Sequence, residues 1–197
     1  MQIDRVLSSP ALDQSYQSHL RLVKPSDAAF ICQLRADPAL NRHLSPSSSV
    51  VLDQAEWITH YKDRERRGEE YYFVISCKEV DYGVVRVYDF HDNPRSFSWG
   101  SWIIKPARPA GLVTFSAVMV YEIGFETLGF EQAHFDVRKG NSKVLNFHLR
   151  SGAVETGETE QNRLFVFPRI SWPGFRQASS SQIKEHRTRR AASTEAW

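Results

Sequence analysis

Cysteine is scarce in this sequence, and its two cysteines, Cys32 and Cys77, lie far apart. They form no CxxC pair and none of the short spacings that are typical of zinc-binding cysteines. The pattern argues against a disulfide framework and favours two ordinary thiols in a reducing, cytoplasmic compartment.

Long apolar runs and a strong charge of one sign are missing too. No stretch approaches the roughly 18 apolar residues that a membrane-spanning helix needs, and the opening MQIDRVLSSPALDQSYQSH lacks the charged-then-apolar pattern of a signal peptide. The formal net charge of +2 is too small to indicate nucleic-acid binding, which needs clustered, strongly basic surfaces. We therefore expect neither a membrane nor a nucleic acid as a partner.

What the chain has is the composition of an ordinary globular protein. Its 197 residues, 41% hydrophobic and 24% charged, are enough for one domain with a buried core. Residues 1–18 are polar and broken by a proline, so they are expected to form a flexible arm. Residues 19–172 are expected to form the domain, and the polar, basic residues 173–197 a frayed tail.

Hydrophobic periodicity predicts a mixed α+β fold. A strand at residues 20–23 precedes a helix capped by Ser26 and a second helix that starts with a capping box of Asp53 and Glu56 and ends at Gly68. Further strands are expected at residues 71–77, 83–90, 96–104, 132–138, 153–158 and 163–169. Helices in two of the intervals between strands complete the order β-α-α-β-β-β-α-β-α-β-β. This order predicts an α/β-type three-layer sandwich, with a mixed, mostly antiparallel sheet of about six to seven strands flanked by helices.

One turn in the middle of the chain can bind an anion. The stretch KPARPAGLVTFSAVMVYEIGFETLGF, residues 105–130, leads from a strand through a turn with one glycine into a long apolar helix. Backbone N–H groups and the helix dipole at such a point favour a pyrophosphate, and Arg108 adds positive charge. A plain strand–helix turn needs a glycine just as often, so the turn alone does not identify a phosphate site.

The order of motifs around this turn resembles that of the GCN5-related N-acetyltransferases (GNAT), in particular the branch that acts on ribosomal-protein N-termini and on nucleotide-linked amino sugars. In that family the turn reads R-x-x-G-x-[GA], and the long helix after it ends in Leu-Gly. The likeness covers roughly residues 19 to 168. The positions that fall in register are Arg108, Gly111, Leu128, Gly129, Asn141, Gly152 and Ala153.

The resemblance implies acetyl-CoA as the acyl donor, a small amine-bearing substrate as the acceptor, and the possibility of a homodimer. It also implies that the strand at 96–104 splays from the strand at 132–138 and that the pantetheine lies between them. The residues implied in cofactor binding are Trp102, Ile103, Ile104, Arg108, Ala110, Gly111, Leu112, Val113 and Asn141. Two positions depart from the family pattern, because Pro109 has no N–H to donate and Val113 is larger than usual, so the site is expected to be weakened but usable.

Acetyl transfer needs a base for the amine and an acid for the departing thiolate. The resemblance places His148 where the family usually has a tyrosine acid, and a histidine could do this work with a pKa nearer neutrality; the alternative is a histidine that only packs. His134 and Asp136 share one face of their strand and are candidates for the base, although charges on strands are more often simply exposed. No metal is expected in the site.

The acceptor side of the sheet is aromatic and weakly charged. Trp99 and Trp102 are separated by an odd interval, so they are expected on opposite faces of their strand, with at most one lining the acceptor site. Aromatic residues suit stacking on a sugar or nucleotide, which favours a nucleotide-linked amino sugar as the acceptor. The alternatives are an N-terminal amine of a protein, or a non-catalytic module that binds CoA.

Overall fold

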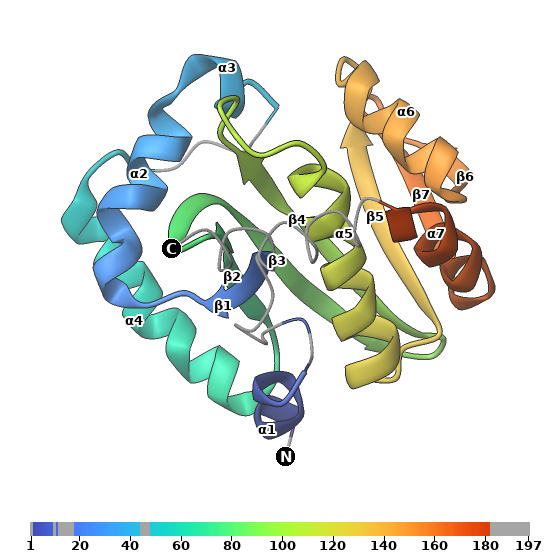
Figure 1. Ribbon diagram of the computed structural model, residues 1–197, viewed down its shortest axis with the longest axis horizontal. Coiled ribbons are helices and arrows are strands. Elements are labelled where there is room, and N and C mark those ends of the chain that lie inside the picture. The colour runs from blue at the N-terminus through green and yellow to red at the C-terminus, as the bar shows by residue number, and fades with distance from the viewer. Residues whose placement is uncertain (1, 10, 12–17, 44–47, 182–197) are drawn as a thin grey trace, which may run out of the picture.

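A single seven-stranded sheet forms the centre of the computed structural model, which describes residues 2–9, 11, 18–43 and 48–181 (Figure 1). Its strand order is β1-β2-β3-β4-β5-β7-β6. The strands are β1 Ser18–Leu22, β2 Tyr71–Cys77, β3 Val80–Asp92, β4 Arg95–Ile104, β5 Gln132–Arg138, β6 Val154–Glu158 and β7 Asn162–Pro168. Only β4 and β5 pair in parallel, and the other neighbours are antiparallel, so the predicted mixed sheet is confirmed.

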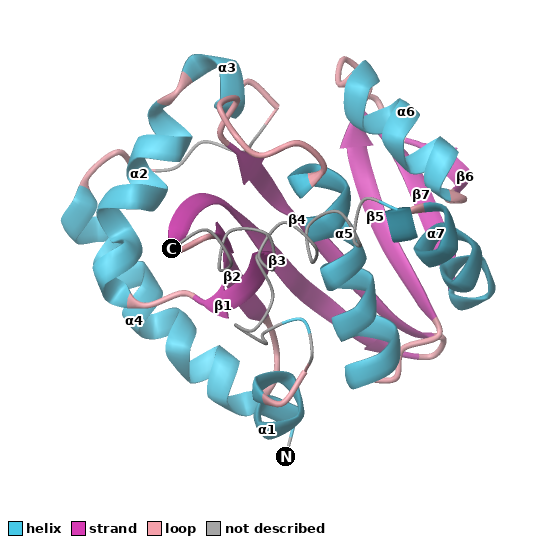
Figure 2. Ribbon diagram, in the orientation of Figure 1, coloured by secondary structure: helices cyan, strands magenta, loops and turns pink. Residues whose placement is uncertain are grey.

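Helices cover both faces of the sheet, as the predicted three layers require (Figure 2). The helices are α1 Gln2–Leu7, α2 Ala28–Ala36, α3 Pro38–Asn41, α4 Val51–Arg67, α5 Leu112–Glu122, α6 Ser142–Ser151 and α7 Trp172–Ala178. One apolar cluster joins α2 and α4 to β2, β3 and β4. A second, larger cluster joins α5, α6 and α7 to the opposite side. We call these the α4 face and the α5 face.

Helix ends follow the sequence signals at most positions. Gly68 and Gly152 end α4 and α6 in the left-handed conformation, with φ of 75° and 101°, and the Asn141 side chain caps α6 by accepting from the Val144 amide. The predicted capping box of α4 is wrong. The helix begins at Val51, and Asp53 instead accepts a hydrogen bond from the Ser48 hydroxyl at 2.6 Å.

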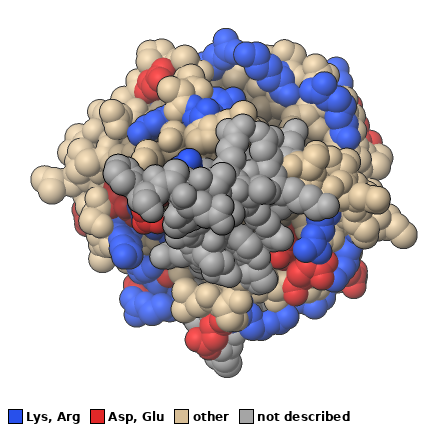
Figure 3. Space-filling model, in the orientation of Figure 1, with Lys and Arg blue, Asp and Glu red and all other residues tan. Residues whose placement is uncertain are grey.

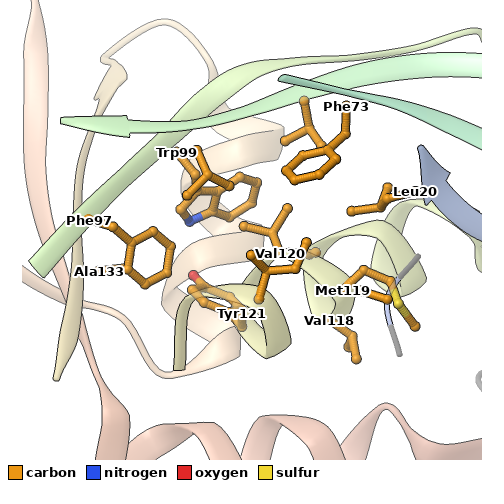
Figure 4. Close-up of a cluster of buried hydrophobic side chains, with 14 of the residues drawn as sticks. Leu20, Phe73, Phe97, Trp99, Val118, Met119, Val120, Tyr121 and Ala133 are labelled. Carbon is orange, nitrogen blue, oxygen red and sulfur yellow. The ribbon is translucent and has the colours of Figure 1, made fainter. Parts of the chain in front are cut away.

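The core beneath α5 is built from aromatic rings that lie between this helix and the sheet (Figure 4). The ring of Tyr121 stacks on Phe167, with centroids 4.3 Å apart, and meets the edge of Trp99 at 5.5 Å. In the π-helical turn that follows α5, a Cβ on Gly124 would lie 2.2 Å from the Phe97 ring. A side chain at this position would therefore push the end of α5 away from β4.

The N-terminal segment differs from the expected arm. Residues 2–7 form α1, and Val6 and Ala11 are fully buried in the larger cluster. Ser9 is tied to Thr127 by a hydroxyl–hydroxyl hydrogen bond of 3.0 Å. The few apolar residues of this polar stretch are thus enough to dock it beside the end of α5.

The C-terminal segment is helical at its start. Trp172 is buried, and its indole N–H donates to the Glu126 carboxylate at 3.0 Å. The expected tail at 173–197 therefore overlaps α7, and residues 182–197 lie outside the described part of the chain. Among the described residues, no helix combines the length and the apolar character that crossing a membrane requires.

Candidate functional site

The strands β4 and β5 separate along their length. They pair only at Ser96 with Gln132 and at Phe97 with Ala133, and Figure 1 shows them meeting at one end and diverging toward the other. The predicted splay of these strands is confirmed. A cavity of about 1020 Å³ opens in the gap, lined by residues from both faces of the sheet.

A bulge in β4 shapes this cavity. Val84 pairs with Ile103 and Arg86 with Gly100, so β4 has one residue more than β3 between these two pairs. Ser101, at the bulge, has a left-handed φ of 49°, which is unfavourable for a residue with a side chain. The extra residue reverses the alternation of side chains along the strand.

The bulge overturns the prediction that Trp99 and Trp102 lie on opposite faces. Their rings meet edge to face with centroids 5.2 Å apart, and both line the cavity. The indole N–H of Trp102 donates to the Ser116 hydroxyl of α5 at 3.0 Å. The two tryptophans thus form one wall between β4 and α5.

The turn before α5 presents backbone amides at the start of an eleven-residue helix. Gly111 is the N-cap, with a left-handed φ of 81° that a side chain would strain. The Leu112 amide donates to the Pro109 carbonyl at 3.3 Å, so this predicted donor is already used. Within the described chain the amides of Ala110, Gly111 and Val113 have no hydrogen-bond partner, and this arrangement fits an anion such as a pyrophosphate.

Arg108 is exposed beside this turn. Its guanidinium donates to the carbonyls of Lys105 and Pro106 at 3.1 and 3.3 Å, which braces the loop. A guanidinium has five N–H donors, so others remain for a ligand. The turn at 108–113 does not line the cavity between the strands, whereas the predicted cofactor residues Trp102, Ile103, Ile104 and Asn141 do.

His148 lies deep in the cavity wall. It is 4% exposed, and the rings of Phe135, Trp99 and Phe147 surround it at 4.2 to 5.3 Å. Its Nδ1 is buried and has no partner among the described residues. Burial lowers its pKa to about 3, so the imidazole is neutral at physiological pH, which corrects the expectation of a pKa nearer neutrality.

The two candidate bases are placed differently. Asp136 is exposed and lines the cavity, and because Phe135 points to His148, the alternation of the strand puts Asp136 on the α4 face. His134 does not line the cavity. Its ring nitrogens lie 3.0 Å from the Ser96 hydroxyl and 3.1 Å from the Asp89 carboxylate.

The α4 face supplies a group of residues that the sequence reasoning missed. The Arg86 guanidinium lies over the rings of Trp57, Tyr72 and Tyr88 at 5.2, 5.8 and 5.1 Å. All four line the cavity. Alternation of Arg86 and Tyr88 on one strand was the available signal, whereas Trp57 comes from α4 and is 36% exposed.

Arg86 is also held by a buried acid. Glu70 is 5% exposed and pairs with Arg86 on β3 and with Arg64 on α4. Two cations around one buried carboxylate satisfy the charge that burial would otherwise make costly. The aromatic wall of the cavity is therefore fixed to the helix above it.

Charge around the cavity is mainly positive. Five cationic side chains, Arg35, Arg42, Arg86, Arg138 and Lys143, line it, against two acidic ones, Asp53 and Asp136. Lys and Arg side chains also predominate along the upper rim of the face in Figure 3, over α3 and the start of α6. This balance favours anionic molecules over cationic ones.

Comparison with known proteins agrees with the geometry. The family model for an acetyltransferase (GNAT) domain matches residues 18–154, more than half of the chain. A solved structure described as apo FdhC, a nucleotide-linked sugar GNAT, is 45% identical, with a TM-score of 0.79 over 85% of this chain and 96% of that one. A search of curated protein sequences gave no match.

Two more distant structures share the fold. The ribosomal-protein-S5-alanine acetyltransferase from Vibrio fischeri is 15% identical, with a TM-score of 0.68 over 79% of this chain and 95% of that one. The dodecameric spermidine N-acetyltransferase from Vibrio cholerae is 17% identical, with a TM-score of 0.64 over 79% of this chain and 96% of that one. With its splayed parallel strands and its match to the family model, the chain belongs to the GNAT family and is an N-acetyltransferase.

Proposed function

We propose that this enzyme transfers an acetyl group from acetyl-CoA to the amine of a nucleotide-linked amino sugar. The observation that carries the proposal is the cavity between β4 and β5, which has an arginine–aromatic wall on the α4 face and mainly positive charge around it. The 45% identical protein described as a nucleotide-linked sugar GNAT supports the same acceptor class.

The turn before α5 has groups that can bind acetyl-CoA, the acyl donor. The amides of Ala110, Gly111 and Val113 can bind the pyrophosphate, with Arg108 beside them. Acetyl-CoA supplies a thioester whose acetyl group is the one transferred. Residues 102–104 line the gap between the strands, where a pantetheine arm can lie.

Two residues on opposite faces of the sheet are assigned to the chemical step, one to accept a proton and one to donate a hydrogen bond. Asp136 on the α4 face can accept the proton that the attacking amine loses. His148 approaches from the other face, and its neutral imidazole has one N–H that can donate a hydrogen bond to the departing thiolate and stabilise its charge while the proton stays on the ring. In this arrangement the attacking amine enters the gap from the α4 face and the departing thiol lies toward the α5 face.

The α4 face has side chains that can bind the base and the diphosphate of a nucleotide-linked acceptor. A nucleotide base can stack on Trp57 or Tyr88, and the cationic lining can pair with a diphosphate. The same lining disfavours a polycationic amine, because like charges repel. A nucleotide-linked sugar carries both the aromatic base and the negative charge that this surface suits.

Thiol release from acetyl-CoA tests the proposal with a panel of amines. We expect nucleotide-linked amino sugars to give a higher kcat/KM than free amino sugars, a peptide amine or a polyamine. Trp57→Ala should raise the KM for the nucleotide-linked sugar by about 5- to 150-fold, the value of one base–aromatic stack, and leave the KM for acetyl-CoA unchanged. Leu52→Ala, at a highly exposed position on α4 outside the cavity, is the matched control.

Equal kcat/KM values for free and nucleotide-linked sugars would contradict the proposed acceptor. If acetyl-CoA binds but no amine of the panel causes release of the CoA thiol, the result would instead favour a module that only binds CoA.

A further inference from the structure

Two histidines and one aspartate meet at the end of the sheet where β4 and β5 still pair. The Asp89 carboxylate lies with one oxygen 3.2 Å from His91 Nε2 and the other 3.1 Å from His134 Nε2. The two imidazole rings are stacked, with centroids 4.5 Å apart and planes 16° from parallel. One ligand-type atom from each residue lies within 4.8 Å of the others.

A second bulge puts these residues together. Tyr88 pairs with Ser98 and His91 with Ser96, so β3 has one residue more than β4 between the pairs. Asp89 takes a left-handed φ of 54° there. Phe90 then turns toward Phe130 in the α5-face cluster, which leaves Asp89 and His91 on the face where His134 lies.

The spacing suits a transition metal ion. A tetrahedral zinc ion with bonds of about 2.0–2.2 Å needs ligand atoms about 3.3–3.6 Å apart. The two carboxylate oxygens of Asp89 lie 3.1 Å from His134 Nε2 and 3.2 Å from His91 Nε2. The largest separation within a set of one ligand atom per residue is at most 4.8 Å, so small side-chain rotations bring the three atoms to zinc-binding distances. Two imidazoles and one carboxylate, partly open to water, form a ligand set that zinc accepts, whereas magnesium prefers oxygen ligands.

The neighbouring residues support this use of His134. The Ser96 hydroxyl lies 3.0 Å from His134 Nδ1, and it can accept from a protonated Nδ1 while Nε2 offers its lone pair. A hydrogen bond to the far ring nitrogen is the usual way to orient a metal-binding histidine. The positive charge of Arg86, which shares a shallow depression with Asp89, is paired with Glu70.

We propose that Asp89, His91 and His134 form a binding site for a divalent transition metal ion, with zinc as the representative ion. The ion joins β3 to β5 across β4, at the point where the β4–β5 pairing ends and the cavity begins. It therefore clamps the base of the splayed strands. The proposal does not depend on the identity of the acceptor.

Isothermal titration calorimetry with zinc chloride tests the site on the full chain, without a histidine tag and freed of metal by a chelator. We expect one zinc ion per chain and no binding of magnesium chloride at the same concentration. His91→Ala should weaken zinc binding at least about tenfold, and because His91 is exposed the fold should persist. Asp89→Asn, which keeps the shape and removes the charge, should also weaken it.

A matched control and a second measurement separate this site from other histidines. His60→Ala removes an exposed histidine of α4 and should bind zinc like the wild type. Zinc should raise the Tm of the wild type and of His60→Ala but not that of His91→Ala, since only a ligand of the folded state stabilises it. Absence of stoichiometric binding, or equal zinc affinity in the wild type, His91→Ala and Asp89→Asn, would overturn the proposal.

Discussion

Acid should weaken the fold through His148, and the size of the effect can be worked from its burial. Burial lowers the pKa of this imidazole from 6.5 to about 3. In the unfolded chain the side chain has its ordinary pKa, so between pH 6.5 and 3 the unfolded state binds a proton that the folded state does not. Stability is therefore complete above pH 6.5 and falls as the pH drops through this window. At 1.36 kcal/mol per pH unit, the loss at pH 5 relative to pH 8 is about 2 kcal/mol.

Urea denaturation of the wild type and of His148→Phe at pH 8, 7, 6 and 5 measures this contribution. The phenyl ring keeps most of the bulk among the surrounding aromatic rings and removes the titrating group. Burial also lowers the pKa of His19, which contributes with the same sign in both proteins and cancels in the difference. We expect the free energy of unfolding of the wild type to fall about 2 kcal/mol further than that of the variant between pH 8 and 5. Parallel loss in both proteins would refute the reasoning, and His60→Ala, at an exposed site, should follow the wild type.

Three further predictions concern the chemistry and the donor site. His148→Phe should lower kcat by about 10²-fold, the effect of removing one hydrogen-bond donor from a developing negative charge, with little change in the KM for acetyl-CoA. His148→Tyr should recover much of the rate, whereas equal turnover of wild type and His148→Phe would make the residue a packing group. Arg108→Ala should weaken acetyl-CoA binding by about 1.5–3 kcal/mol in calorimetry, whereas unchanged affinity would limit Arg108 to bracing its own loop. Pro109→Gly should tighten acetyl-CoA binding by roughly 1 kcal/mol through one regained amide donor, and weaker binding would show that proline preorganises the turn.

The fold was predictable from periodicity and from the glycines and asparagine at helix ends. Gly68, Asn141 and Gly152 end or begin their helices as expected because each offers a conformation or a side-chain acceptor that the position needs. The insertion of β7 between β5 and β6 was not predictable, because neighbours in the sheet need not be neighbours in the chain.

The candidate site was predictable only where strands are regular. The prediction for Trp99 and Trp102 failed because one extra residue at Ser101 reverses the alternation on which the argument depended. The same kind of irregularity at Asp89 brings His91 to a partner 43 positions away in the chain. Bulges arise from how two strands pair, and one strand's sequence does not contain that information.

The protonation state of His148 depends on its burial, which the structure shows and the sequence does not. The resemblance to the family places it beside the thioester site, but its environment depends on rings from β4, β5 and its own helix. Its neutral state follows from those contacts. A residue's charge is thus a property of its surroundings in the fold.

The pairing of Arg86 with the buried Glu70 makes some routes of divergence easier than others. A descendant enzyme that adopts a new acceptor could replace the exposed Trp57 with little effect on its fold. Replacement of Arg86 would leave the buried Glu70 with Arg64 alone and would loosen the attachment of α4 to the sheet. Changes of acceptor in this lineage should therefore begin on the helix side of the wall and reach the strand only after a compensating change at Glu70.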